Sequence, residues 1–160
     1  MKIAIIYHSK TGNTKKVAEI IGQGIKDSGD IEVKLMGIDE VDYEFLKEAK
    51  AVIFGTSTYY ANVSWQIKKW FDESFGCNLE GKIGAVFATE DYLGGGADTV
   101  LMTLIGHMMV KGMLIYSGGS ALGQPYIHMG IVTIKDGDEG QKQRAKIFGE
   151  RIGKKVLELF

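Results

Sequence analysis

The stretch MKIAIIYHSKTGNT, residues 1–14, decides how the rest of the sequence is interpreted. Its apolar run 3–7 is nearly continuous, which predicts a strand buried on both faces of a parallel sheet. Apolar residues then recur at helical spacing from Val17 to Ile25. The polar loop in between therefore feeds a helix N-terminus, where free N–H groups and the helix dipole favour an anion. This combination predicts a phosphate site, and a polar turn with a good N-cap is the alternative.

The composition limits the classes of protein that this chain can represent. Its 160 residues predict one domain, 1–160, and 45% hydrophobic against 24% charged residues is typical of a globular protein. The net charge is −1, so no basic surplus favours a nucleic-acid partner or a membrane surface. The apolar start is too short for a signal-peptide core, and no apolar run could span a bilayer. These features predict a cytoplasmic protein.

The cysteine, histidine and methionine residues predict no disulfide and no metal site. The only cysteine, Cys77, excludes an internal disulfide and a multi-cysteine metal site. The three histidines are widely spaced, so we expect no metal. Four methionines cluster late in the chain, and we interpret them as core residues: Met102, Met108, Met109 and Met113.

Strand and helix patterns alternate along the whole chain. Strands are predicted at 3–7, 31–36, 51–55, 82–88 and 113–116, with 131–134 as an extension of the last. Five helices are predicted between and after these strands. The first follows residue 14, the second is short and capped by Asp42, and the third is opened by Ser64, with Trp65 and Phe75 among its apolar residues. The fourth runs from Asp98 to Met109, and the last is amphipathic and ends near Leu159. The pattern predicts an α/β protein, with a five-stranded parallel sheet in the order 2-1-3-4-5 between two helix layers.

In such a sheet the ligand lies beyond the carboxyl ends of the strands, at the switch point between strands 1 and 3. The loops after strands 1, 3 and 4 meet there. They are the three loops richest in hydroxyl, aromatic and glycine residues: 9–14, 56–62 and 89–96.

These loops carry a family resemblance. Residues 9–14, SKTGNT, resemble the [ST]-x-T-G-x-T phosphate loop of flavodoxins. Residues 55–64, GTSTYYANVS, resemble the G-[ST]-P-T-x-x-G-N-x-S loop of the flavodoxin-like quinone reductases, the tryptophan-repressor-binding-protein type. Residues 85–96, ending in a glycine triplet, resemble the third loop of the same group. The resemblance implies the flavodoxin-like fold, a three-layer α/β/α sandwich, with FMN as its cofactor.

Residue types suggest how each loop would serve FMN. Hydroxyl and backbone N–H groups of the first loop would surround the phosphate, while tyrosines of the other two would flank the ring and their main chain would meet its polar edge. The predicted cofactor-binding residues are Ser9, Lys10, Thr11, Gly12, Asn13 and Thr14; Thr56, Ser57, Thr58, Tyr59, Tyr60, Ala61 and Asn62; and Thr89, Glu90, Asp91, Tyr92, Gly94, Gly95 and Gly96.

The sequence also departs from the family patterns. Ser57 stands where the quinone reductases have a proline, and Ala61 stands where a glycine is expected. Lys111 replaces a histidine of that group, and the chain has a much shorter equivalent of its long insertion. These departures count against typical quinone handling and tetramer assembly.

Two activities fit the resemblance. We prefer an FMN enzyme that takes hydride from NAD(P)H and reduces a quinone, because the near-neutral charge differs from the acidic character of electron-shuttle flavodoxins. The alternative is a flavodoxin, a one-electron carrier that docks to partner redox proteins, and a weaker third is regulatory association. His128 or Tyr126 would deliver a proton to a bound quinone, with loop packing as the alternative role. The chain could also form a homo-oligomer.

Overall fold

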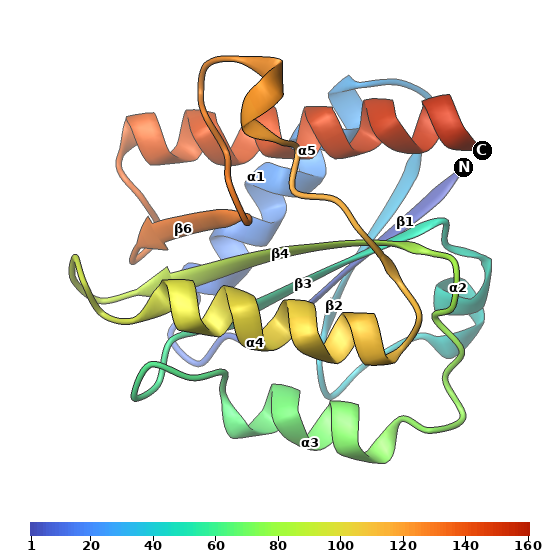
Figure 1. The fold of residues 1–160 in the computed structure, drawn as a ribbon, viewed down its shortest axis with the longest axis horizontal. Helices are drawn as coiled ribbons and strands as arrows, with labels where there is room; N and C mark the ends of the chain where they lie inside the picture. Colours follow the sequence, from blue (N-terminus) through green and yellow to red (C-terminus); the bar gives the residue numbers. More distant parts are fainter.

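The computed structural model describes residues 1–160 and contains one parallel sheet (Figure 1). Its order is β2-β1-β3-β4-β5, with β6 also paired to β4, which confirms the predicted order 2-1-3-4-5. The strands are β1 Lys2–Tyr7, β2 Glu32–Gly37, β3 Ala51–Ser57, β4 Ile83–Glu90, β5 Leu114–Ile115 and β6 Ile131–Ile134. The helices are α1 Asn13–Asp27, α2 Tyr43–Glu48, α3 Trp65–Glu73, α4 Ala97–Val110, the 3-10 turn η1 Ser120–Leu122 and α5 Glu139–Leu159.

Helices cover both faces of the sheet, as Figure 1 shows, with α1 and α5 on one side and α3 and α4 on the other. The strand β1 explains the two cores, because side chains along a strand alternate between faces. Ile3 and Ile5 join the core under α1 and α5, whereas Ala4 and Ile6 join the core under α3 and α4. The nearly continuous apolar sequence of the central strands thus follows from burial on both faces.

Two short strands share the outer position beside β4. The strand β5 pairs only with Ile83 and Gly84, while β6 pairs with residues 87–90 at the carboxyl end of β4. The predicted extension at 131–134 is confirmed, and the predicted strand 113–116 is only two residues long. Residues 116–130 form a long loop that interrupts this position and lies over α5 in Figure 1.

The side chain of Arg151 on α5 holds this loop. Its guanidinium donates hydrogen bonds of 3.0–3.4 Å to six backbone carbonyls, those of Gly118, Gly119, Leu122, Gly123, Gln124 and Pro125. A loop rich in glycine loses much conformational entropy when it is ordered, and the hydrogen bonds from Arg151 offset this loss and hold the loop 116–130 in one conformation.

Helices α1 and α5 approach closely because glycines face the contact. A Cβ on Gly24 would lie 2.1 Å from the carbonyl oxygen of Lys146, and one on Gly149 would lie 2.1 Å from that of Ile21. Only hydrogen fits at these two positions, so the two glycines are required by the packing.

Several apolar residues of the predicted helices are exposed. Trp65 and Phe75 leave 69% and 90% of their surface accessible, and Phe75 lies beyond the end of α3. Met102 and Met109 are exposed as well, so only Met108 and Met113 of the methionine cluster are buried; Leu159 is also exposed. Helical spacing marks a residue as apolar without saying whether a neighbour covers it, which is why the prediction of core packing was wrong for Met102 and Met109.

None of the helices combines the length and the apolar character needed to cross a membrane. No group of three or more His, Cys, Asp or Glu side chains is arranged to hold a metal ion.

Candidate functional site

The loop between β1 and α1 presents a row of free backbone donors. Gly12 precedes α1 in a left-handed conformation, with φ 92°, and a Cβ there would meet nothing within 4 Å. The N–H groups of residues 10–14 donate no hydrogen bond within the protein, and the next N–H, that of Lys15, donates to Ser9 Oγ at 3.2 Å. Five consecutive free donors at a helix N-terminus form an anion-binding concavity.

Side chains around this loop add polar groups. Ser9 and Asn13 are half-buried, while Lys10 and Thr11 are exposed. No acidic residue lies in the first turn of α1, so nothing there competes with an incoming anion for the helix N-terminus.

The hydroxyl of Thr14 joins the three loops. It lies 2.9 Å from Ser57 Oγ at the end of β3 and 2.9 Å from Thr89 Oγ1 near the end of β4. Thr14 is fully buried and Thr89 nearly so. The cluster therefore fixes the start of α1 against the carboxyl ends of two neighbouring strands.

The loop after β3 is a tight hairpin turn. Tyr59 and Asn62 exchange backbone hydrogen bonds of 2.9 Å in both directions, while Tyr60 and Ala61 between them have φ of 49° and 56°. Left-handed backbone at a non-glycine residue carries a cost, which explains why a glycine is the family's choice where this chain has Ala61. Thr58 has a buried Oγ1 without any hydrogen-bond partner.

The loop after β4 is anchored by a buried carboxylate. Glu90 is only 9% exposed, and its Oε2 accepts a hydrogen bond from the N–H of Ala97, the first residue of α4, at 3.2 Å. Gly94 and Gly96 have positive φ, and a Cβ on Gly96 would lie 2.5 Å from that of Ala61. The second and third loops therefore touch, and only glycine fits at the contact.

The loop tips expose aromatic and apolar side chains, namely Tyr59, Tyr60, Tyr92 and Leu93. Asp91 and Gly94 are exposed as well. Thr56 instead lies beneath its loop, where its Oγ1 lies 3.0 Å from the backbone oxygen of Ser57 and 3.1 Å from Ser64 Oγ. Most of the predicted residues are thus brought to the same edge of the sheet, on the left in Figure 1.

His8 was not among the predicted residues, although it directly follows β1. Its Nδ1 is buried without a partner, and burial lowers the pKa of the imidazole, partly offset by Asp39. The sequence signal for His8 was its position between the central strand β1 and the predicted phosphate loop.

Tyr126 and His128 lie elsewhere. Both belong to the loop 116–130, and the backbone oxygen of Tyr126 accepts a hydrogen bond from Arg144 on α5. His128 precedes β6, which starts opposite Phe87 in the middle of β4 and not at its carboxyl end. The structure does not bring these two side chains together with the three loops.

The family follows from comparison of the whole chain. The family model "Flavodoxin" matches residues 5–146. The chain belongs to the flavodoxin family. A flavodoxin of Clostridium saccharobutylicum is 55% identical over 160 residues, covering 100% of both chains. The solved structure of a flavodoxin from the domain Archaea is 30% identical, with a TM-score of 0.80, and the match covers 98% of this chain and 99% of that one.

These relatives correct the preferred interpretation of the sequence. An NAD(P)H dehydrogenase (quinone) of Paraburkholderia phymatum is 28% identical, over 84% of this chain and 76% of that protein, and is thus a more distant relative than the flavodoxins. The prediction of an NAD(P)H-dependent quinone reductase was wrong, and the relatives support the alternative, a flavodoxin. The quinone dehydrogenases, and with them the tryptophan-repressor-binding-protein type, are more distant relatives. The near-neutral charge had favoured the enzyme, but the flavodoxin relatives outweigh it.

Proposed function

We propose that this flavodoxin binds FMN with its three loops and carries electrons between partner redox proteins. The observation that carries the proposal is the row of five free N–H groups at residues 10–14, beside the hydroxyl cluster of Thr14, Ser57 and Thr89. A phosphate monoester is the anion that suits such a row, and FMN is the cofactor that flavodoxins bind.

In this proposal the first loop holds the phosphate. The N–H groups of residues 10–14 donate to its oxygens, and the hydroxyls of Ser9 and Thr11 add further donors. Lys10 supplies a positive charge from an exposed position, so its contribution is smaller than that of the backbone. Gly12 keeps the entrance open because nothing projects from its Cα.

The second and third loops hold the ring. Tyr59, Tyr60 and Tyr92 are exposed enough to pack on its faces. The N–H groups of Tyr60 and Ala61 donate no hydrogen bond within the protein, nor do those of residues 91–94. Together with the unpartnered Oγ1 of Thr58, these groups suit the polar edge of the ring. The bound FMN supplies reversible storage of electrons, while the chain orients it and limits its contact with water.

The partner proteins would dock on the exposed loop tips, because electrons must reach the ring over a short distance. Tyr60, Tyr92 and Leu93 project from these tips. Exposed aromatic side chains are typical anchors of protein interfaces. The cytoplasmic location stays a prediction.

Binding of FMN by loop variants tests the phosphate assignment. The double variant Ser9→Ala with Thr11→Val loses two hydrogen bonds to a charged group, worth about 1.5 kcal/mol or more each, so we expect the Kd for FMN to rise at least about 100-fold. Ser120→Ala, which removes an exposed hydroxyl from the loop over α5, is the matched control and leaves the Kd unchanged. Unchanged binding by the double variant contradicts the phosphate assignment.

Potentiometric titration tests the carrier role. A one-electron carrier holds its two electrons at well-separated potentials, and we expect two resolved one-electron steps in the FMN-loaded protein. A single two-electron step speaks against the carrier role without touching the phosphate assignment.

A further inference from the structure

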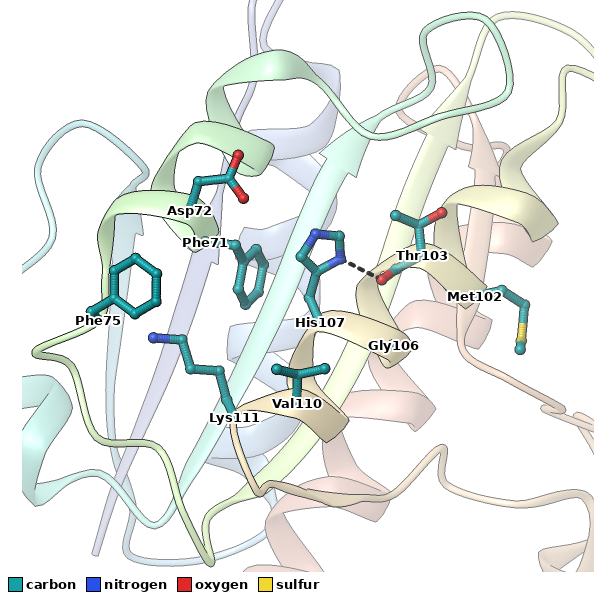
Figure 2. A pocket seen from close by; sticks show the side chains of 9 residues that line it. All are labelled: Phe71, Asp72, Phe75, Met102, Thr103, Gly106, His107, Val110 and Lys111. Atoms are coloured by element: carbon teal, nitrogen blue, oxygen red, sulfur yellow. Dashed lines mark hydrogen bonds between the residues drawn. The ribbon is translucent and has the colours of Figure 1, made fainter.

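Ionisable side chains in the groove between α3 and α4 are satisfied by the chain's own backbone. Figure 2 shows His107, whose Nδ1 lies 2.6 Å from the backbone oxygen of Thr103. Lys111, which lines the same groove, donates to the backbone oxygen of Ser74. Glu90, at the edge of the sheet that carries the cofactor loops, differs from these groups because it is a buried anion without a cation beside it.

The carboxylate of Glu90 lies beneath the loop after β4, at residues 91–96. Glu90 is the last residue of β4 and is only 9% exposed, which is rare for a glutamate. Its Oε2 accepts a hydrogen bond of 3.2 Å from the N–H of Ala97, the first residue of α4. A Cβ on Gly95 would lie 2.9 Å from the same oxygen. The loop is therefore folded over the carboxylate and held by it to the start of α4.

No cation of the chain neutralises this carboxylate. None of the nine ion pairs includes Glu90. Its side chain borders a hollow of about 620 Å³ between the loop, α4 and β6, and no Lys, Arg or His lines that hollow. The N-terminus of α4 supplies only the partial positive charge of the helix dipole. A net negative charge is therefore left beneath the loop.

The other charges around this loop are exposed. Asp91 lies on the loop and Asp98 in the first turn of α4, and both face solvent. Lys135 follows β6 and is exposed as well, although its N–H donates to the backbone oxygen of Glu90 at 2.7 Å. Water and salt screen these three side chains, whereas the buried charge of Glu90 is screened much less.

We propose that Glu90 is a positioning residue that also tunes the cofactor: its hydrogen bond fixes the loop 91–96 against the ring of FMN, and its negative charge opposes uptake of the second electron. The inference rests on the proposed binding of FMN by the three loops. The free N–H groups of residues 91–94, which the proposed function assigns to the polar edge of the ring, directly follow Glu90 in the chain.

The two electrons differ in the charge that they add to the ring. The first is taken up together with one proton from water, so the net charge of the ring is unchanged. The second is taken up without a proton above neutral pH and adds one negative charge. Both electrons come from a reduced partner protein and leave to an oxidised one. Because like charges repel, a buried carboxylate under the ring-binding loop makes the second step less favourable and leaves the first nearly unchanged.

Potentiometric titration of the FMN-loaded protein, in a buffer above neutral pH, tests the effect of the charge. Glu90→Gln keeps an oxygen that accepts from the N–H of Ala97 and removes the charge. We expect the equilibrium constant for uptake of the second electron to rise roughly tenfold, about 59 mV for one electron, with the Kd for FMN unchanged. Asp98→Asn is the matched control, because it removes the same charge from an exposed position, and its shift should be much smaller.

Amide hydrogen exchange of the protein without FMN tests the positioning role. Two N–H groups of residues 91–97 are hydrogen-bonded, those of Gly95 and Ala97. Glu90→Ala should speed exchange at both, because the loop loses its attachment to α4, whereas Glu90→Gln should leave both rates close to those of the wild type.

A second potential that moves no further in Glu90→Gln than in Asp98→Asn overturns the effect of the charge. Wild-type exchange at Gly95 and Ala97 in Glu90→Ala overturns the positioning role. Neither result touches the proposed function, whose failure shows instead as a wild-type protein that binds no FMN.

Discussion

The hydroxyl cluster at Thr14 gives the sharpest prediction for stability. Replacement of Thr14 by Val keeps the shape of the side chain and removes both of its 2.9 Å hydrogen bonds, to Ser57 and to Thr89. Each bond is worth about 1 kcal/mol. Thr89 has no other side-chain partner and is 4% exposed, so its stranded hydroxyl adds about 1 kcal/mol of desolvation cost.

The expected loss in the free energy of unfolding is therefore about 2–3 kcal/mol, or roughly 5–10 °C in Tm for a chain of this length. Thr89→Val alone should cost about 1 kcal/mol, because Thr14 keeps its bond to Ser57. The double variant leaves no hydroxyl stranded at position 89 and loses the shared Thr14–Thr89 bond only once, so its loss should be smaller than the sum of the two single losses by about 2 kcal/mol.

Urea denaturation of the protein without FMN measures these three values, with an unchanged m-value as the check that unfolding stays two-state. Thr99→Val, on the exposed face of α4, is the control and should change stability by less than about 0.5 kcal/mol. Additive losses, within about 0.5 kcal/mol, would refute the reasoning that the three side chains form one cluster.

Three further predictions concern the scaffold. Gly149→Ala should lower the free energy of unfolding by about 1–3 kcal/mol in urea denaturation, because its Cβ would collide with α1, whereas Gly140→Ala on the exposed first turn of α5 should not; equal effects would contradict the close contact. Arg151→Met should speed amide hydrogen exchange in the loop 116–130 without changing exchange in the sheet, and unaltered exchange in the loop would show that the guanidinium does not hold it. Burial lowers the pKa of His8, so the unfolded chain takes up the proton first; stability should fall as the pH drops below about 6.5, the usual histidine pKa, and His8→Asn should flatten that part of the profile.

The central sheet could be predicted from the sequence because burial on both faces leaves continuous apolar runs. The runs at 3–7 and 51–55 correspond to β1 and β3, and the polar loops that follow them lie side by side at the carboxyl edge. Sequence order and the rule for parallel sheets were enough to bring them together.

Other features depend on contacts that no local pattern reveals. The strand β5 ends where the loop 116–130 begins, and this loop is held by Arg151, which lies more than 25 residues along the chain from each of its six partners. The exposure of Phe75 and Met109 could not be read from spacing, because a covered and an uncovered apolar helix face have the same sequence pattern. The partners of Thr14 were also missed, since its hydroxyl was expected at the phosphate.

The activity was misjudged for a different reason. Net charge governs solubility and the rate of encounter with partners more than it identifies a reaction. Near-neutral charge was therefore weak evidence for an enzyme, and the flavodoxin relatives, one of them 55% identical over the whole chain, outweigh it.

The most direct test of the account is to load the protein with FMN and mix it anaerobically with NADH or NADPH while the flavin absorbance is followed. We expect one FMN per chain and no bleaching by either nucleotide, followed by full bleaching with dithionite and rapid reoxidation by a one-electron acceptor protein. Rapid bleaching by NADH or NADPH alone would contradict the carrier role, and failure to bind FMN would contradict the central claim itself.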